Sequence, residues 1–334
     1  MSFMAELHSS LSTTLAGVHL TGPLISAAGT GGTATELEDV LDLADFGALT
    51  TKSITPEPRA GNPAMRVADV PAGMLNAVGL MNMGVDAFLA GTVPALSGRP
   101  TTFIGSVAGH SIEDYVQVAA AFDAVEAFPL IELNLSCPNS STGRRFTDGP
   151  SELAEVVREV RGAVVRSRIL VKLPLLFETA VPMAAAAIEA GADGLTMINT
   201  VPALSIDVED RTSRLGSGHG GLSGPAVHLP ALSMVQRIHA GVARDAKVPI
   251  VGLGGVRRWE QAAAFVLAGA TAVGIGTTLY HDHRAPRRIN RGLARWVAAQ
   301  GCSRLDGSTC RARDLDTALR YTAAPPLGFA GRFA

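Results

Sequence analysis

Short apolar runs recur along the chain, and segments with a helical pattern lie between them. Several of these runs are nearly continuous stretches of Val, Ile and Leu, which are typical of strands buried on both faces. Strands that alternate with helices form a mainly parallel sheet, so the pattern predicts the α/β class. We expect strands over residues 24–29, 46–53, 101–109, 130–136, 169–174, 194–200, 249–255 and 272–278.

Such an alternation is compatible with an open doubly wound sheet or with a closed (β/α)8 TIM barrel. Three features favour the barrel. The runs number eight, and no Gly-x-Gly-x-x-Gly motif follows the first of them. The last two runs end in Gly254-Gly255 and Gly276-Thr277, where barrels commonly bind phosphate.

Two connections, 54–82 and 201–224, are longer than usual and leave the carboxyl ends of strands. Long loops in a compact domain are usually functional, so we expect them at the catalytic face of the barrel. Residues 204–208 alternate between apolar and polar types, which predicts a small extra hairpin. Residues 1–300 should form a single barrel domain, followed by a C-terminal extension over residues 301–334.

Helix signals lie between the expected strands. Ser111 and Asp114 have the spacing of a capping box. Residues 151–166 place apolar side chains at helical spacing along one face. Gly191 and Gly269 stand where helix C-caps are expected.

Composition excludes several classes of protein. The 334 residues carry a formal net charge of −2, so no basic excess exists to bind nucleic acid. Three cysteines are too few for an iron–sulfur cluster, which needs about four thiolates, and their odd number argues against a secreted disulfide framework. No stretch approaches the roughly 18 apolar residues of a membrane span, and the N-terminus lacks the regions of a signal peptide. We expect a cytoplasmic protein with no membrane partner.

The densest group of chemically useful residues is the sequence 134–139, Asn-Leu-Ser-Cys-Pro-Asn, at the end of the fourth strand. Alternation puts Asn134 on the same face as Ser136, and Pro138 ends the strand, so Cys137 and Asn139 should lie on the rim. A thiol becomes a useful base once its thiolate is stabilised. The alternative is a buried structural cysteine in an Asn/Pro turn, because these residues are also common turn formers.

Two lysines, Lys52 and Lys172, fall within expected strands. A buried ammonium must pair or face a ligand, because leaving it alone is costly. It could therefore serve an anionic cofactor such as a flavin, or it could form a structural ion pair, for which Glu132 is a candidate partner. Asn76 and Asn199 could complete a polar ring for a small planar ligand, or act as turn residues. His281 and His283 lie on either side of Asp282, and they indicate a solvated loop rather than a metal site.

Taken together, these residues resemble class 1 dihydroorotate dehydrogenases, the cytosolic kind. The resemblance runs from Leu15 to Gln300. Cys137 itself favours class 1, because class 2 members have Ser at this position. The chain departs from the family pattern after Asn139, where Arg144 and Arg145 stand in a loop that is usually rich in glycine. The ordered motifs cover residues 51–53, 57–59, 61–63, 73–76, 134–139, 198–200 and 220–226, with the glycine turns at Gly254 and Gly276.

The resemblance implies an FMN-binding barrel that oxidises dihydroorotate to orotate in pyrimidine biosynthesis, with Cys137 as the catalytic base. It implies substrate contacts from Lys52, Asn76, Gly79, Leu80, Asn134, Asn139, Asn199 and Thr200. It implies FMN contacts from Ala28, Gly29, Lys52, Ser53, Asn134, Lys172, Gly224, Gly254, Gly255, Gly276 and Thr277.

The motifs at 198–200 and 220–226 look more like the NAD-linked subclass 1B than the fumarate-linked subclass 1A. Subclass 1B implies a homodimer joined to an electron-transfer subunit with FAD and an iron–sulfur cluster. Two alternatives remain at this point. One is a related FMN-dependent dihydropyrimidine oxidoreductase, and the other is a non-redox phosphate-binding TIM barrel.

Overall fold

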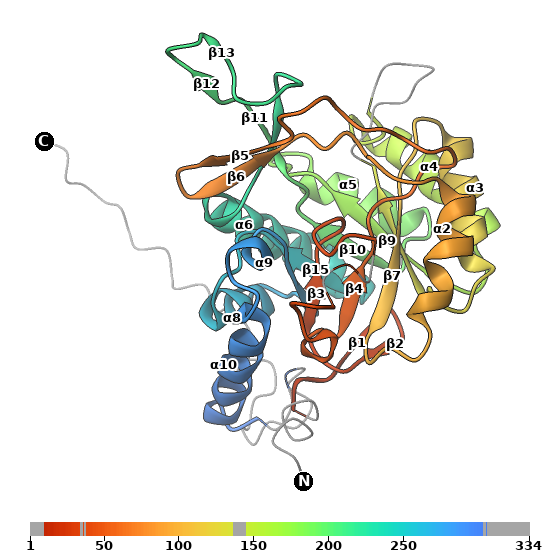
Figure 1. The fold of residues 1–334 in the computed structure, drawn as a ribbon. Coiled ribbons are helices and arrows are strands. Elements are labelled where there is room, and N and C mark those ends of the chain that lie inside the picture. The colour runs from red at the N-terminus through yellow and green to blue at the C-terminus, as the bar shows by residue number, and fades with distance from the viewer. Residues whose placement is uncertain (1–9, 34–35, 37, 136–144, 303–304, 306–334) are drawn as a thin grey trace, which may run out of the picture.

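The structure is a computed structural model, and it describes residues 10–33, 36, 38–135, 145–302 and 305. Eight parallel strands close into a barrel, and their order around it follows their order in the chain (Figure 1). The predicted (β/α)8 fold is therefore confirmed. The barrel strands are β3 (Leu24–Ser26), β4 (Ala48–Thr50), β7 (Thr102–Val107), β8 (Leu130–Asn134), β9 (Arg168–Leu173), β10 (Gly194–Met197), β15 (Ile250–Leu253) and β16 (Ala272–Ile275).

The predicted strands all occur, but most of them end earlier than the apolar pattern indicates. Lys52, for example, lies just beyond the end of β4 rather than within a strand, whereas Lys172 lies within β9. Pairing stops where the chain turns away to form the loops at the carboxyl ends of the strands, which we call the upper face of the barrel. An apolar pattern records burial and not hydrogen bonding, so it cannot locate that point.

Helices surround the barrel. Ser111 caps α3 by accepting a hydrogen bond from the backbone N–H of Asp114, as the sequence predicts. The Asp114 carboxylate reaches back to the N–H of His110 instead of Ser111. Gly191 and Gly269, with φ of 107° and 105°, follow the C-caps of two helices. The helices are α2 (Val85–Gly91), α3 (Ile112–Asp123), α4 (Pro150–Ala163), α5 (Ala180–Glu189), α6 (His228–Ile238), α7 (Arg244–Ala246), α8 (Trp259–Leu267), α9 (Thr278–His281) and α10 (Ala285–Ala299).

Short helical turns complete the connections. They are the 3-10 turns η1 (Leu43–Asp45), η2 (Val93–Leu96) and η3 (Pro225–Val227), and the π turn η4 (His239–Ala243).

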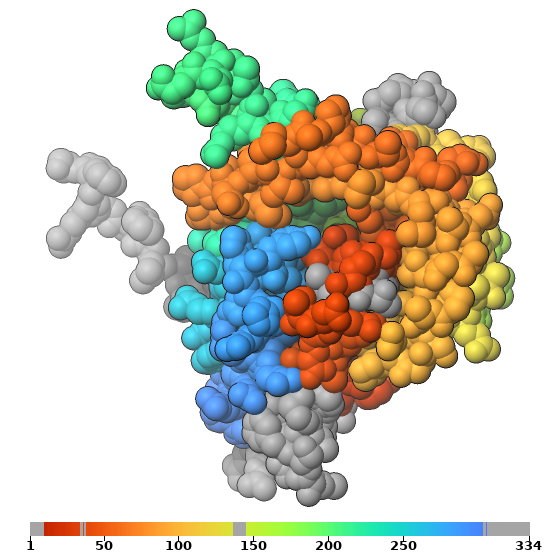
Figure 2. Space-filling view, in the orientation of Figure 1, coloured from red at the N-terminus to blue at the C-terminus, as the bar shows by residue number. Residues whose placement is uncertain are grey.

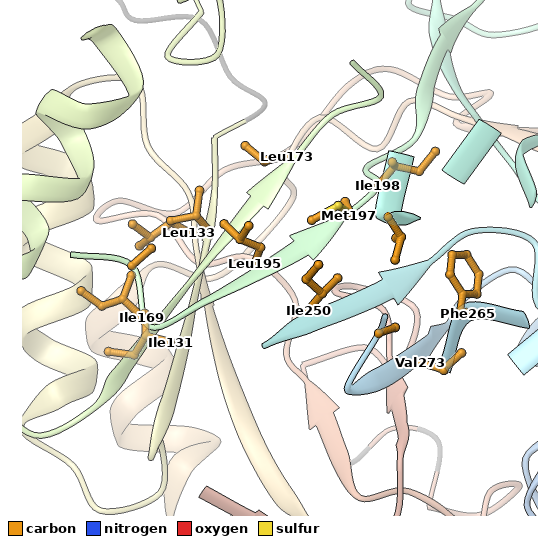
Figure 3. Packing of buried hydrophobic residues seen from close by; sticks show 14 of the residues in the cluster. Ile131, Leu133, Ile169, Leu173, Leu195, Met197, Ile198, Ile250, Phe265 and Val273 are labelled. Carbon is orange, nitrogen blue, oxygen red and sulfur yellow. The ribbon is translucent and has the colours of Figure 1, made fainter. Parts of the chain in front are cut away.

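In every barrel strand except β10, alternate residues belong to two separate apolar cores. One core lies between the strands and the surrounding helices; Ile131, Leu133 and Ile169 belong to it (Figure 3). The other fills the lower interior of the barrel. It contains Ile25, Ala48, Ile104, Leu130, Leu170, Val251 and Ala272.

A hairpin that the sequence analysis did not anticipate closes the lower end of the barrel. It consists of β1 (Thr13–Leu15) and β2 (Val18–Leu20), and its Leu15 and Leu20 pack into the lower interior core. The turn uses Ala16 and Gly17 at φ of 50° and 85°. The strands are too short to give a period-2 pattern, so packing rather than local preference specifies them.

The two long connections build a second layer over the upper face. Strands β11 (Val201–Ala203), β14 (Gly220–Ser223), β6 (Gly73–Asn76) and β5 (Val67–Val70) form a four-stranded sheet there. Strands β12 (Ile206–Asp207) and β13 (Thr212–Ser213) form the predicted extra hairpin, which projects away from the barrel (Figure 1). Figure 2 shows the orange segment that includes β5 and β6 crossing above the red first strands and the blue C-terminal helices.

Among the described residues, no helix is both long and apolar enough to cross a membrane. Cys302 is buried and disulfide-bonded. The division of the chain at residue 300 stays a prediction.

Candidate active site

A cavity of about 860 Å³ opens at the carboxyl ends of the barrel strands, below the four-stranded sheet. Every described residue that the sequence analysis assigned to a ligand lines it. Cys137 and Asn139 lie outside the described residues. The assigned residues in the wall are Ala28, Gly29, Lys52, Ser53, Asn76, Gly79, Leu80, Asn134, Lys172, Asn199, Thr200, Gly224, Gly254, Gly255, Gly276 and Thr277.

Two barrel strands place Asn134 and Lys172 in the wall of the cavity. Because side chains alternate along a strand, Leu130, Glu132 and Asn134 of β8 all point inward at rising heights. Lys172 of β9 is in register with Asn134, and its Nζ lies 3.4 Å from Oε1 of Glu132. Both side chains are about 95% buried, so each charge needs the other. The ion pair that the sequence analysis kept as an alternative is present, and Lys172 still reaches the cavity.

A chain of hydrogen bonds fixes two carboxamides in the site. Oδ1 of Asn199 accepts from the backbone N–H of Thr200 at 2.8 Å, and that N–H can only donate. Nδ2 of Asn199 therefore faces Oδ1 of Asn134 at 3.1 Å, and Nδ2 of Asn134 donates to Oγ of Ser53 at 3.0 Å. Oγ of Ser53 lies 2.8 Å from Oγ of Ser106. The direction of the first bond thus sets which edge each carboxamide turns towards the cavity.

The other end of the cavity is lined by backbone. Gly254 and Gly255 have φ of 152° and 64°, which disfavour any side chain. A Cβ on Gly255 would lie 2.6 Å from the carbonyl oxygen of Gly224. Nδ1 of the buried His228 lies 2.9 Å from the carbonyl oxygen of Gly254, which braces this turn. Backbone that approaches this closely suits a phosphate, which N–H groups can surround.

Lys52 enters the cavity from the loop after β4 and is partly buried. Burial lowers the pKa of its ammonium from the usual 10.5, the nearby Glu36 carboxylate opposes that shift and Arg66 adds to it. Asn76 lies on β6, and its Nδ2 donates to the carbonyl of Gly221 at 3.3 Å. The overlying sheet thus brings Asn76 to the same cavity as the barrel residues.

The cavity wall is electropositive. Lys52, Arg145 and Lys172 line it, and no Asp or Glu does so within the described part of the chain. Lys172 is neutralised by Glu132, whereas Arg145 has no ion pair among the described residues. The wall therefore favours anionic ligands. No described group of His, Cys, Asp and Glu side chains is arranged to hold a metal ion.

Three residues that hold parts of the site in place were not predicted from the sequence. Ser106 ends the hydrogen-bond chain, His228 braces Gly254, and Tyr115 donates to the carbonyl of Asn134. Each is buried and far in sequence from its partner. A buried Tyr or His on a helix looks like ordinary core, so only the fold reveals these contacts.

Comparisons with known proteins agree on one family. The family model described as dihydroorotate dehydrogenase matches residues 10–297. A protein of Solibacter usitatus, provisionally named dihydroorotate dehydrogenase A (fumarate), is 41% identical over 292 residues, which are 87% of this chain and 94% of the relative. The dihydroorotate dehydrogenase B (NAD(+)) catalytic subunit of Geobacter sp. is 40% identical over 289 residues, covering 86% of this chain and 93% of the relative. The subunit of the same name from Bacteroides thetaiotaomicron is 38% identical over 293 residues, covering 87% and 95%.

Proposed function

The chain belongs to the dihydroorotate dehydrogenase family, and from that premise we propose that its upper cavity is where dihydroorotate is oxidised. The protein is an oxidoreductase with dihydroorotate dehydrogenase activity, which serves pyrimidine biosynthesis. The reaction takes a proton from C5 and a hydride from C6, and it forms the C5–C6 double bond of orotate. The site therefore needs a base, a hydride acceptor and groups that orient the ring between them.

Members of this family are generally flavin-dependent, and we propose that the flavin is FMN. When bound, FMN would supply the acceptor for the C6 hydride. The glycine-lined end suits its phosphate, and Lys172 offers a cation to its ring system. The residues proposed to hold it are Ala28, Gly29, Lys52, Ser53, Asn134, Lys172, Gly224, Gly254, Gly255, Gly276 and Thr277.

The carboxamide chain is proposed to hold the substrate ring. Because Thr200 sets the direction of the chain, the second N–H of Asn199 is directed by the fold and can donate to a ring carbonyl or carboxylate. Lys52 supplies a positive charge for the substrate carboxylate. The proposed substrate contacts are Lys52, Asn76, Gly79, Leu80, Asn134, Asn139, Asn199 and Thr200.

Cys137 is proposed as the base for the C5 proton. A thiolate is basic enough to remove a proton near neutral pH when it is held close to the carbon acid. Cys137→Ser should keep its flavin but slow flavin reduction by dihydroorotate by about 10²-fold or more. Stopped-flow absorbance under anaerobic conditions measures this rate, and an unchanged rate would exclude Cys137 as the base.

One observation carries the proposal: all the described residues that are expected to bind FMN and substrate line a single electropositive cavity. The test is an anaerobic visible spectrum of the purified protein before and after dihydroorotate is added. A flavin spectrum that bleaches supports cofactor and substrate together. A flavin that stays oxidised would contradict the substrate assignment, and a protein that binds no FMN after reconstitution would contradict the cofactor.

A separate subunit is proposed to pass the electrons on to NAD. Several relatives carry the name of a catalytic subunit of the NAD-linked enzyme, and this chain has too few cysteines to hold an iron–sulfur cluster itself. That subunit would carry FAD and the cluster, and the catalytic chain would form a homodimer. Reoxidation of the reduced protein by fumarate alone, with no partner present, would argue for the fumarate-linked type instead.

A further inference from the structure

Tyr115 connects two parts of the active-site wall that are distant in sequence. It lies in the first turns of α3 and is fully buried. Its hydroxyl donates to the backbone carbonyl of Asn134, with 2.8 Å between the oxygens. Its ring meets Phe146 edge to face, with centroids 5.4 Å apart and planes at 84°. One side chain therefore contacts one residue before and one residue after the segment that contains Cys137.

The bond from Tyr115 reaches Asn134 at the end of its strand. Pairing between β7 and β8 ends at Leu133, whereas pairing between β8 and β9 continues to Asn134 and Lys172. Asn134 is buried, at 8% exposure. Removing a donor from a buried carbonyl is costly, so the Tyr115 hydroxyl helps to hold the main chain of Asn134 in place.

Tyr115 itself is held by the fold and not by the site. Ser111 caps its helix, and Tyr115 itself is fully buried. On the other side Phe146 is 2% exposed. The next residues form a closed turn, in which Arg145 donates to the Asp148 carboxylate and accepts from the Asp148 N–H. Tyr115 and Phe146 are therefore both fixed before any ligand binds.

We propose that Tyr115 is a positioning residue for the active site. It sets the main-chain position of Asn134, and thereby the hydrogen bonds of the Asn134 carboxamide to Ser53 and Asn199. It also fixes the distance between Asn134 and Phe146. In the sequence, the segment with Cys137 runs between these two residues. This inference rests on the proposed function, because it assigns a purpose to Asn134 and Cys137.

The test is Tyr115→Phe, which removes the hydroxyl and keeps the ring. Orotate should bind about tenfold more weakly, since one hydrogen bond no longer orders the carboxamides. The alkylation rate of Cys137 by iodoacetamide, followed by peptide mass spectrometry, should lose part of its protection by orotate. FMN affinity should stay within about twofold of the parent, because the glycine-lined end is untouched. Phe146→Leu removes the other contact and should change the same two readouts.

The matched control is Phe122→Leu. Phe122 is also a fully buried aromatic residue of α3, but it packs on Phe128 at 4.7 Å and not on the site. It should lower thermal stability without changing orotate affinity or Cys137 protection. If Tyr115→Phe matches the parent in both readouts, or if Phe122→Leu changes them equally, the positioning role is wrong. Failure of the parent protein to reduce its flavin with dihydroorotate would instead contradict the proposed function.

Discussion

The lower and upper halves of the barrel interior are built by the same strands but filled with opposite kinds of side chain. On β8 the inward positions run from Leu130 through Glu132 to Asn134. On β9 they run from Leu170 to Lys172, and on β7 from Ile104 to Ser106. The position of an inward side chain along its strand therefore decides whether it packs in the apolar core or belongs to the polar layer above it.

The two ends of the barrel are closed by different means. The lower end is sealed by the apolar Leu15 and Leu20 of the β1–β2 hairpin. The upper end is covered by a small sheet that leaves the cavity below it. A dry lower core can give stability through burial alone, whereas the upper polar layer needs each group to be paired or to meet a ligand.

The largest expected effect comes from breaking the polar layer. Lys172→Met leaves the Glu132 carboxylate buried without its partner, and it should lower the free energy of unfolding by about 3–5 kcal/mol. FMN binding should also weaken, because one cation of the cavity wall is gone. Denaturant unfolding and FMN titration measure the two losses.

A second change sharpens the same comparison. Adding Glu132→Leu to Lys172→Met should restore most of the stability and none of the FMN affinity, since apolar pairs can replace buried ion pairs. If FMN affinity returned with stability, the upper layer would act through packing, and the division between the two halves would be wrong.

Leu170→Ala tests the lower half. The side chain is fully buried in the interior core, so its truncation should cost about 2–5 kcal/mol of stability through lost burial and a cavity. The rate of flavin reduction per folded molecule should stay near that of the parent. A large change in that rate, measured at a temperature where the variant is folded, would show that the lower core also shapes the site.

Local signals in the sequence predicted the barrel strands and many of the residues that line the cavity, but not the four-stranded sheet above it. Eight apolar runs indicated the barrel strands, and the motif around Asn134 and the glycines after β15 and β16 indicated the cavity. Strand ends were predicted too late, because burial continues after pairing stops. The β1–β2 hairpin was missed, because Leu15 and Leu20 find their partners only in the closed barrel.

The supporting residues were missed for the same physical reason. Tyr115 lies on the buried face of an amphipathic helix, where a tyrosine is expected as core, and its partner Asn134 is on another element. His228 and Ser106 likewise act through contacts that only the closed fold creates. Local patterns thus identify the groups that line the cavity better than the groups that hold them.

A smaller effect concerns the charge of the upper half. Burial lowers the pKa of Lys52, so its ammonium loses the proton below the usual 10.5. Below the lowered pKa the folded state bears the cost of the buried charge, and this group's contribution to stability rises as pH increases towards 10.5. Orotate is an anion and favours the protonated form, so its affinity should fall by up to about tenfold per pH unit above that lowered pKa. Orotate titrations across pH check this, and Lys52→Met should remove the dependence.

The smallest expected effect is at the rim, where Arg145 lines the cavity without a described ion pair. Its backbone is held by the turn with Asp148, but its guanidinium is exposed to solvent, so it acts across water. Such a charge attracts an anionic substrate at long range and is screened by salt within about 10 Å at 0.1 M. Arg145→Gln should therefore lower kcat/KM for dihydroorotate about two- to fivefold at low ionic strength and hardly at all at high salt. Arg214→Gln, a change at an exposed arginine outside the cavity wall, is the control. A loss for Arg145→Gln that persisted in high salt would mean direct contact with the substrate, and the rim would then belong to the chemistry of the upper half.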